Sequence, residues 1–272
     1  MFEKYHLEKI TDLEHGGQKE VMLCSSDEFG RVVYKTGKCY SENSLKRIIR
    51  EVDILHEINS QYFPKIFDFD FSNTSGEFQI LEQYIPSKSL NQCRNIFNNE
   101  NKVVYLLLEL IEGMKLLWDK SIVHRDLKPN NILIKADLRP VIIDLGIARI
   151  NTEDSLTNTN LPSGPRTPVY SAPEQILNRK NLIDMRTDFF ILGIVSAELL
   201  LNINPFDPII AGGKFIEDNI VKGQYNLSNG VHKINNNLLI ILKKMLQNKQ
   251  FLRYKNYSLL QIDLLKIRRE YE

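Results

Sequence analysis

Residues 122–134 read IVHRDLKPNNILI, and this stretch decides how the rest of the chain is interpreted. A run of charged and amide side chains lies between two apolar runs. Pro129 prevents a simple continuing helix, because proline has no backbone N–H and its ring clashes with the preceding turn. The stretch therefore predicts a polar loop between two apolar segments, and it carries the strongest sign of chemistry in the sequence.

Two more motifs follow this loop. VIIDLGIA at 141–148 is an apolar strand pattern that ends in an acid and a glycine, with Asp144 eighteen residues after Asp126. TPVYSAPEQ occupies 167–175. In this order the three motifs resemble the catalytic loop, the metal-binding loop and the substrate-loop anchor of eukaryotic-type (Hanks-type) serine/threonine protein kinases. The resemblance covers roughly residues 10–265 and implies a kinase catalytic domain.

The resemblance implies an α+β, two-lobed fold. A small, mainly antiparallel β lobe with one helix would bind ATP, and a larger, mainly α-helical lobe would carry the catalytic loop, with the ATP cleft between them. Residues 85–89, IPSKS, interrupt the strand pattern. We therefore expect an N-terminal ATP-binding lobe at 1–86 and a C-terminal catalytic and substrate-binding lobe at 87–272, which together form one kinase domain.

Hydrophobic periodicity predicts the elements of each part. Two short apolar runs flank a turn that contains Gly30, as in a β-hairpin. A stretch with apolar residues at helical spacing begins after Ser41, which suits an N-cap. The predicted strands are 21–25, 31–35, 65–71 and 78–85, and the predicted helices are 41–58, 103–117, a buried 188–201 and two or three after residue 231.

The resemblance gives each polar residue of the loop a role. Phosphoryl transfer depends mainly on positioning and on neutralisation of charge. Asp126 would accept the proton of the acceptor hydroxyl and orient it, and Lys128 would stabilise charge on the transferring phosphoryl group. Asn131 and Asp144 would hold Mg²⁺, or Mn²⁺ in its place, through the oxygen ligands that Mg²⁺ prefers.

The first lobe would supply most of the ATP-binding residues. Lys35 lies where the family has the lysine that binds the α and β phosphates, and Glu51 matches the glutamate that pairs with it. Residues 83–85 are expected to offer backbone hydrogen bonds to adenine. By resemblance, the ATP-binding residues are Gly16, Gly17, Val21, Val33, Lys35, Glu51, Gln83, Tyr84, Ile85 and Leu133.

Other matches imply scaffold contacts in the second lobe. Glu174 would pair with Arg253 and connect the substrate loop to the C-terminal helices. His124 would pack under the catalytic loop, and Asp188 and Gly193 would belong to the start of the central buried helix.

The glycine-rich loop departs from the family pattern GxGxxGxV. With Val21 as the fixed point, its three glycine positions hold Glu14, Gly16 and Lys19. A Cβ at the first and third positions hinders close approach of the backbone to phosphate. The sequence therefore predicts altered or weakened nucleotide affinity rather than none.

Three smaller departures lie outside that loop. Leu145 replaces the phenylalanine of the DFG motif, which conserves a packing role. Val33 replaces the usual alanine two residues before the lysine and would crowd the adenine. Glu82 aligns with the gatekeeper position, unless the alignment shifts by one residue.

The implied activity is transfer of the ATP γ-phosphoryl group to serine or threonine hydroxyls of a protein substrate. Lys128 is typical of the serine/threonine group, and Thr167 lies where that group has a threonine beside the catalytic residues. Arg125 precedes Asp126, an arrangement in which a phosphorylated activation loop pairs with the arginine. Autophosphorylation within 150–167, with self-association for reaction in trans, is a hypothesis. Its candidate sites are Thr152, Ser155, Thr157, Thr159, Ser163 and Thr167.

Two alternatives stay open. The altered glycine loop favours a pseudokinase-like scaffold that binds nucleotide and partners without catalysis. A small-molecule phosphotransferase of the antibiotic-kinase type would have the same two-lobed layout, but such enzymes resemble HGDxxxxN and lack an APE-like anchor. Lys128 and the SAPE sequence favour a protein substrate.

The composition of the whole chain limits its partners. The 272 residues have a formal net charge of +1, so no basic excess points to nucleic acid or to an anionic membrane. The three cysteines form no cluster, which favours reduced thiols. The N-terminal MFEKYHLEKI carries charges where a signal peptide needs an apolar core, and the apolar run at 189–197 is too short to span a bilayer. We therefore expect a cytoplasmic protein with no membrane partner.

Overall fold

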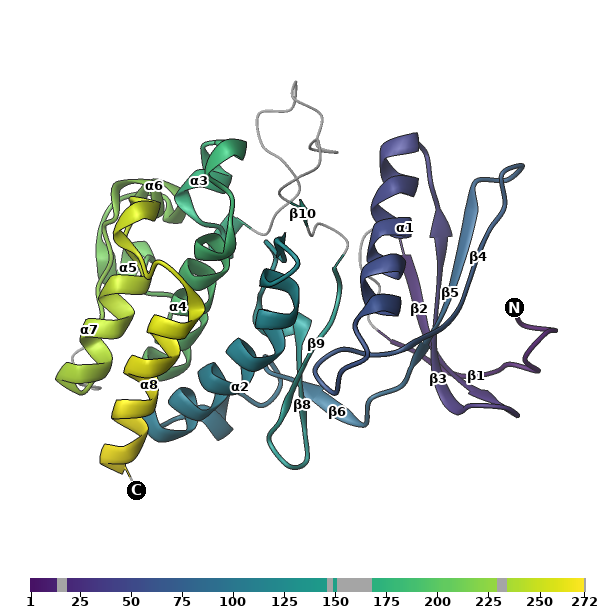
Figure 1. Ribbon diagram of the computed structural model, residues 1–272, viewed down its shortest axis with the longest axis horizontal. Helices are drawn as coiled ribbons and strands as arrows, with labels where there is room; N and C mark the ends of the chain where they lie inside the picture. Colours follow the sequence, from purple (N-terminus) through teal and green to yellow (C-terminus); the bar gives the residue numbers. More distant parts are fainter. Residues whose placement is uncertain (14–18, 146–148, 151–167, 229–233, 272) are drawn as a thin grey trace. The chain divides into compact units, whose positions relative to one another are not determined.

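The computed structural model describes residues 1–13, 19–145, 149–150, 168–228 and 234–271 (Figure 1). The chain divides into two compact units, Met1–Pro86 and Ser87–Glu272. The first contains an antiparallel sheet and one helix, and the second is mainly helical. This composition confirms the α+β fold class that the sequence predicted.

The first unit is built on a five-stranded antiparallel sheet with the strand order β1-β2-β3-β5-β4. Gly30 has φ +68°, a left-handed conformation that glycine adopts without steric cost, and it turns the chain from β2 into β3. The predicted strands are confirmed and are longer by one to three residues at several ends. Their bounds are β1 Glu8–Asp12, β2 Lys19–Ser26, β3 Gly30–Lys38, β4 Ile66–Phe71 and β5 Glu77–Gln83.

The strand register separates an apolar face of this sheet from a face that carries charge. Cys24 and Val32 are cross-strand partners, as are Tyr34 and Leu81, and all four are buried in one cluster with Leu7.

Residues on the alternate positions point to the other face, because side chains alternate along a strand. Val21 is opposite Lys35, and Val33 is opposite Glu82. Val21, Val33, Lys35 and Glu82 therefore share one face of the sheet.

Helix α1, Glu42–Glu57, is amphipathic, as the spacing of its apolar residues predicts. Ile48, Val52 and Leu55 are buried along one side. At its start Ser41 Oγ accepts a hydrogen bond from Ser44 N–H at 3.2 Å, and Ser44 Oγ accepts one from Ser41 N–H at 3.1 Å. This reciprocal capping box satisfies two backbone donors that a helix start leaves without partners.

The second unit contains seven α-helices and five short strands among its described residues. The helices are α2 Glu100–Trp118, α3 Pro173–Ile176, α4 Met185–Leu201, α5 Pro208–Ala211, α6 Ile216–Lys222, α7 Asn236–Met245 and α8 Tyr257–Tyr271. The strands are β6 Ser87–Ser89, β7 Ile122–Val123, β8 Ile132–Lys135, β9 Pro140–Ile142 and β10 Arg149–Ile150. Five 3₁₀ turns accompany them: η1 Arg94–Phe97, η2 Pro129–Asn131, η3 Pro168–Tyr170, η4 Lys180–Leu182 and η5 Gln250–Leu252.

Helix α4 forms the core of the second unit. Every residue from Thr187 to Leu201 is buried, which agrees with its nearly all-apolar sequence. A Cβ on Gly193 would lie 3.1 Å from atoms of Leu246 and Met245, so glycine lets α4 pass close to the end of α7. None of the helices in the described ranges is both long and apolar enough to cross a membrane.

One detail differs from the sequence prediction. The stretch 85–89 was predicted only as an interruption, but it includes β6, which pairs with β8. The segment 150–167, where the sequence predicts autophosphorylation, lies outside the described residues except for Ile150.

Replacing Ser41 with alanine removes the oxygen that caps α1. We expect the loss of about 1 kcal/mol of local stability, the usual cost of losing an N-cap, and hence amide hydrogen exchange about fivefold faster in the first half of α1. Asn43→Ala, at the second position of the same helix, is the control and should not speed exchange. Equal exchange rates in Ser41→Ala and wild type would show that the cap does not stabilise the helix.

Candidate active site

The loop between β7 and β8 places three polar side chains together. Lys128 Nζ lies 2.8 Å from Asp126 Oδ2. Asn131 Nδ2 donates to the same Oδ2 at 3.1 Å and to the Asp126 carbonyl at 2.9 Å. The Asp126 carboxylate is thereby held between an ammonium group and an amide, and the sequence prediction that these three residues act together fits this geometry.

A buried carboxylate in α4 fixes the backbone of this loop. Asp188 Oδ2 accepts from His124 N–H at 3.0 Å, and Oδ1 accepts from Arg125 N–H at 2.9 Å. Trp118 Nε1 donates to Asp188 Oδ2 at 2.9 Å. Burial raises the pKa of Asp188, and the nearby His124 together with these donors opposes that rise.

The fixed loop is also a tight one. Arg125 has φ +73°, in the left-handed region that non-glycine residues adopt rarely. Its carbonyl accepts from Gln175 Nε2 at 2.9 Å. Hydrogen bonds on both sides of the peptide therefore hold Arg125 in this conformation and orient the next residue, Asp126.

The candidate metal ligands lie at one end of the β8–β9 hairpin. Asn131 immediately precedes β8, and its carbonyl accepts from Ile143 N–H at 3.0 Å, one residue before Asp144. Because Asn131 Nδ2 is bound to Asp126, its amide oxygen is the atom that remains to face a cation. An amide oxygen and a carboxylate are hard ligands that fit Mg²⁺, which takes its other ligands from water and phosphate.

The described residues contain no group of three or more His, Cys, Asp and Glu side chains that could hold a metal ion. The two candidate ligands at the hairpin end are the amide of Asn131 and the carboxylate of Asp144.

In the first unit, the ion pairs differ from the one that the resemblance implies. Lys35 Nζ lies 2.6 Å from Glu82 Oε2. Glu51 Oε2 lies 2.7 Å from Lys19 Nζ. The resemblance pairs Lys35 with Glu51, which stays a prediction; in the structure the glutamate of α1 also has a cation at the start of β2.

The burial of Glu82 explains why a lysine lies beside it. Glu82 is only 4% exposed, and burial raises its pKa, whereas the Lys35 ammonium group lowers it. A buried carboxylate without a cation is costly, and Lys35 shares its sheet face. The sequence placed Glu82 at the gatekeeper position but gave it no partner. The sequence signal that could have revealed the pair is strand alternation. Side chains two residues apart point to the same face, so Lys35 shares a face with Val33 and with Glu82 opposite it.

The hinge candidates follow directly on β5. Gln83 N–H donates to the Lys65 carbonyl at 2.8 Å, and its side-chain oxygen accepts from Lys65 N–H. The Gln83 N–H is thus already bound inside the sheet, so it is not the donor that the predicted hinge offers to adenine.

The other ATP-binding candidates are distributed as follows. Val21 and Val33 lie on the sheet face that carries Lys35, and Leu133 is half-buried in β8 of the second unit. Glu14, Gly16 and Gly17 lie outside the described residues.

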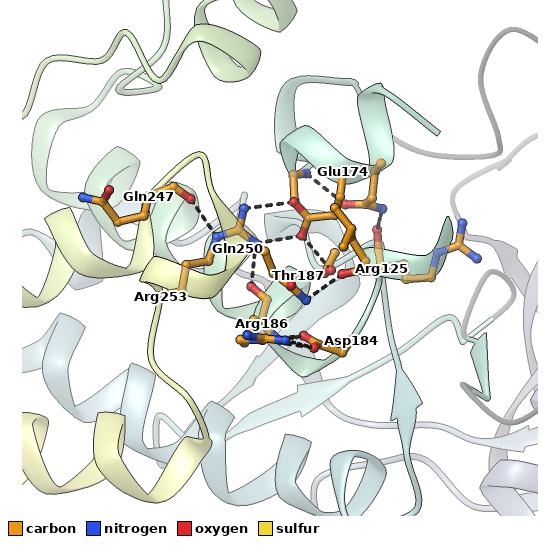
Figure 2. A network of polar contacts seen from close by, with 11 residues as sticks. Arg125, Glu174, Asp184, Arg186, Thr187, Gln247, Gln250 and Arg253 are labelled. Atoms are coloured by element: carbon orange, nitrogen blue, oxygen red, sulfur yellow. Dashed lines mark hydrogen bonds and ion pairs between the residues drawn. The ribbon is translucent and has the colours of Figure 1, made fainter. Parts of the chain in front are cut away.

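The predicted scaffold pair of the second unit is present. Arg253 donates to both carboxylate oxygens of Glu174, at 2.7 and 2.9 Å (Figure 2). Thr187 Oγ1 donates to Glu174 Oε1 at 2.8 Å, and Arg253 also binds the carbonyls of Arg186 and Gln247. Both members of the pair are almost fully buried, so α3 is fixed to the C-terminal helices.

The sequence pattern described as "Protein kinase domain" matches residues 7–265. The chain belongs to the protein kinase family. The family prediction from the three motifs is therefore confirmed.

Several relatives are serine/threonine kinases. The kinase is 29% identical over 214 residues to "Mitogen-activated protein kinase kinase 8" of Arabidopsis thaliana, covering 76% of the chain and 67% of that relative. It is 29% identical over 266 residues to "Serine/threonine-protein kinase D" of Synechocystis sp., covering 91% of the chain and 49% of the relative. It is 35% identical over 211 residues to "Probable serine/threonine-protein kinase PknB" of Lactococcus lactis, covering 73% and 32%. The kinase thus spans half or less of the two bacterial relatives.

One polar cluster of the kinase was not found from the sequence. Glu198 in α4 accepts from Arg94 at 2.9 Å and from the Tyr170 hydroxyl at 2.7 Å. Burial and the Glu198 carboxylate raise the pKa of the Tyr170 hydroxyl far above its ordinary value. The cluster connects η1 and the segment before SAPE to the core helix. Its members are far apart in sequence, so no local pattern revealed it.

The regulatory candidates cannot be placed in the same way. Thr152, Ser155, Thr157, Thr159, Ser163 and Thr167 all lie outside the described residues. Arg125, the residue proposed to pair with a phosphate, lies in the described part of the chain. Its backbone N–H donates to Asp188, and its carbonyl accepts from Gln175.

Arg253→Met leaves the Glu174 carboxylate buried without its cation. Removing one partner of a buried pair costs about 3–5 kcal/mol, so we expect the free energy of unfolding to fall by that amount. The fluorescence of Trp118, the single tryptophan, reports urea unfolding of the second unit. Lys266→Met, which breaks an exposed pair with Asp263, is the control and should change the stability by less than about 0.5 kcal/mol. An Arg253→Met midpoint equal to that of Lys266→Met would contradict the anchoring role.

Proposed function

We propose that this kinase transfers the γ-phosphoryl group of ATP to serine or threonine hydroxyls of a protein substrate. The observation that carries the proposal is the Asp126 carboxylate, which is held between Lys128 and Asn131 at hydrogen-bonding distance. A carboxylate in this position can accept a proton from a hydroxyl while the neighbouring ammonium group neutralises phosphoryl charge.

The division of roles follows from what each side chain can do. Asp126 orients the acceptor hydroxyl and takes its proton as the oxygen attacks phosphorus. Lys128 is a cation with three donors, so it can bind Asp126 and a phosphoryl oxygen together. Asp188 keeps the loop backbone in place, so little reorganisation is needed when the substrate binds.

Asn131 and Asp144 are the residues that would hold Mg²⁺, or Mn²⁺ in its place. The bound cation would neutralise phosphate charge and orient the nucleotide. On the first unit, Val21 and Val33 would contact the adenine, and Tyr84 and Ile85 would hydrogen-bond its edge. Leu133 would pack against the base from the second unit.

A protein substrate is favoured over a small molecule. The buried Glu174–Arg253 pair fixes the SAPE segment and α3 to the C-terminal helices, and such an anchor suits a surface that aligns an extended peptide. Lys128 and the similarity to serine/threonine kinases favour serine/threonine over tyrosine acceptors. The cytoplasm, which the three free thiols favour, is the proposed compartment.

Asp126→Asn tests the proposal, because it keeps the shape of the side chain and removes its basicity. We expect the rate of transfer from radiolabelled ATP to fall on the order of 10²–10⁴-fold, while the thermal shift caused by Mg-ATP is kept. Asp137→Asn, in the turn at the far end of the β8–β9 hairpin, is the matched control with full activity.

Turnover retained in Asp126→Asn would refute the role of this residue. Wild-type protein that binds Mg-ATP without transferring label would instead support the pseudokinase-like scaffold. Label transferred to a small hydroxyl compound and not to protein would support the phosphotransferase alternative.

We further propose that the kinase phosphorylates its own segment 150–167 in trans, with Arg125 as the cation that binds the phosphate. A phosphate adds about −1.5 to −2 charge, which an arginine can bind through two donors.

Mass spectrometry after incubation with Mg-ATP should find phosphate on one or more of the six candidate hydroxyls. The rate of incorporation per molecule should rise with protein concentration, as a reaction between two copies requires. A rate independent of concentration would contradict the trans reaction, and phosphate confined to residues outside 150–167 would contradict the site.

A further inference from the structure

Trp118, the last residue of α2, contacts aromatic rings from two other helices. Its indole meets Phe189 of α4 edge-on, with ring centroids 5.0 Å apart and an interplanar angle of 88°. It also stacks on Tyr257 of α8, with centroids 5.9 Å apart and an angle of 23°. The indole is buried, with only 3% of the residue exposed. Two ring contacts of different orientation therefore restrict rotation of the indole plane.

The orientation of the indole matters because it has a single hydrogen-bond donor and no acceptor. Its Nε1 donates to Asp188 Oδ2 at 2.9 Å. The same oxygen accepts from His124 N–H, and the other carboxylate oxygen accepts from Arg125 N–H. The indole therefore binds the buried carboxylate that holds the loop in which Asp126 lies.

Hydrogen bonds between α8 and α2 determine where the Tyr257 ring lies. The Tyr257 hydroxyl donates to Oδ1 of Asp119, the C-cap of α2, at 2.9 Å. One turn further along α8, Gln261 Nε2 donates to Glu112 Oε1 at 2.5 Å. Side chains one turn or two turns apart lie on the same face of a helix, so both bonds belong to one seam between the two helices. The seam keeps the Tyr257 ring against the indole of Trp118.

We propose that Tyr257 is a positioning residue for phosphoryl transfer, which acts through Trp118 on the Asp188 carboxylate. The proposal rests on the proposed kinase function, because it gives α8 a part in orienting Asp126. The Tyr257 ring fixes the indole, the indole donates to the carboxylate, and the carboxylate holds two N–H groups of the loop. A change at the start of α8 is thereby transmitted to the residue that would accept the proton of the substrate hydroxyl.

Hydrogen exchange measured by NMR tests this chain of contacts without any activity. The chain has one tryptophan, so its indole N–H gives a single resonance. Tyr257→Leu removes the stacked ring and keeps an apolar side chain. We expect exchange of the indole N–H and of the His124 and Arg125 N–H groups to become about 2- to 30-fold faster, the range for effects transmitted through packed side chains. Amides in the middle of α4 should change less, which distinguishes local loosening from global unfolding.

Steady-state kinetics on the full chain measure the effect on the reaction. Tyr257→Leu should lower kcat about 2- to 30-fold while KM for ATP stays near the wild-type value, because the change reaches the loop and not the nucleotide. Tyr257→Phe keeps the ring and loses only the hydroxyl, so it should recover most of the loss. Phe251→Leu, at a phenylalanine of η5 that is 71% exposed, is the matched control with wild-type values.

A double-mutant cycle tests whether the effect passes through the indole. Trp118→Phe keeps an aromatic ring and removes the donor to Asp188, so kcat should fall at least as far as in Tyr257→Leu. Tyr257→Leu added to Trp118→Phe should change kcat little further, because the connection is already broken. Effects of the two changes that multiply would show that Tyr257 acts by another route and would overturn the proposal.

The remaining outcomes separate this proposal from the proposed function. Wild-type exchange of the indole N–H and of the two loop N–H groups in Tyr257→Leu would overturn the proposal, whatever the value of kcat. Faster exchange with a kcat equal to that of Phe251→Leu would overturn the role in the reaction. If exchange rises as expected but the wild-type protein transfers no phosphate, the contacts hold the loop as proposed and the kinase reaction itself fails.

Discussion

The interaction on which the catalytic geometry depends is the acceptance of three hydrogen bonds by the Asp188 carboxylate. Two of its donors are backbone N–H groups of the loop, and the third is the indole of Trp118. The carboxylate lies in the most buried helix of the second unit, so it moves with the core and not with the surface. A loop tied to such a group can keep Arg125 in an unfavourable backbone conformation and present Asp126 in one orientation. The geometry around Asp126 is thus set by a residue that need not touch a substrate.

In the first unit, several charged side chains lie on one face of the sheet, and each buried charge needs a partner of opposite sign. Glu82 on β5 lies opposite Val33, and Lys35 is two residues further along β3 on the same face. Glu51 on α1 pairs with Lys19 at the start of β2. Each acid has a base within 2.7 Å, so the group of four has no net charge. The burial of Glu82 makes a neighbouring cation necessary, and Lys35 on the adjacent strand supplies it.

Much of this was predictable from the sequence, and the reasons differ by region. The strands, α1 and α4 follow from local periodicity, and Ser41 and Gly30 mark their ends by simple backbone chemistry. The polar loop and the Glu174–Arg253 pair followed from the sequence motifs, because the order of those motifs along the chain resembles that of protein kinases. The ion pairs of the first-unit sheet, Lys19–Glu51 and Lys35–Glu82, did not, because pairing depends on strand register and on burial, and neither can be read from one stretch. The contacts of Glu198 were missed for the same reason, since they join residues from η1, η3 and α4.

The Glu174–Arg253 pair has a consequence for synthesis of the chain. Its two members are 79 residues apart, and a ribosome adds about 5–20 residues per second. The Glu174 carboxylate therefore waits several seconds for its cation, with the nearby Thr187 hydroxyl as a weaker partner that is made earlier. During that interval the segment after SAPE cannot be buried at low cost. Completion of the anchor must be a late event in folding, so an incomplete chain that ends before Arg253 would expose this segment to proteases and chaperones.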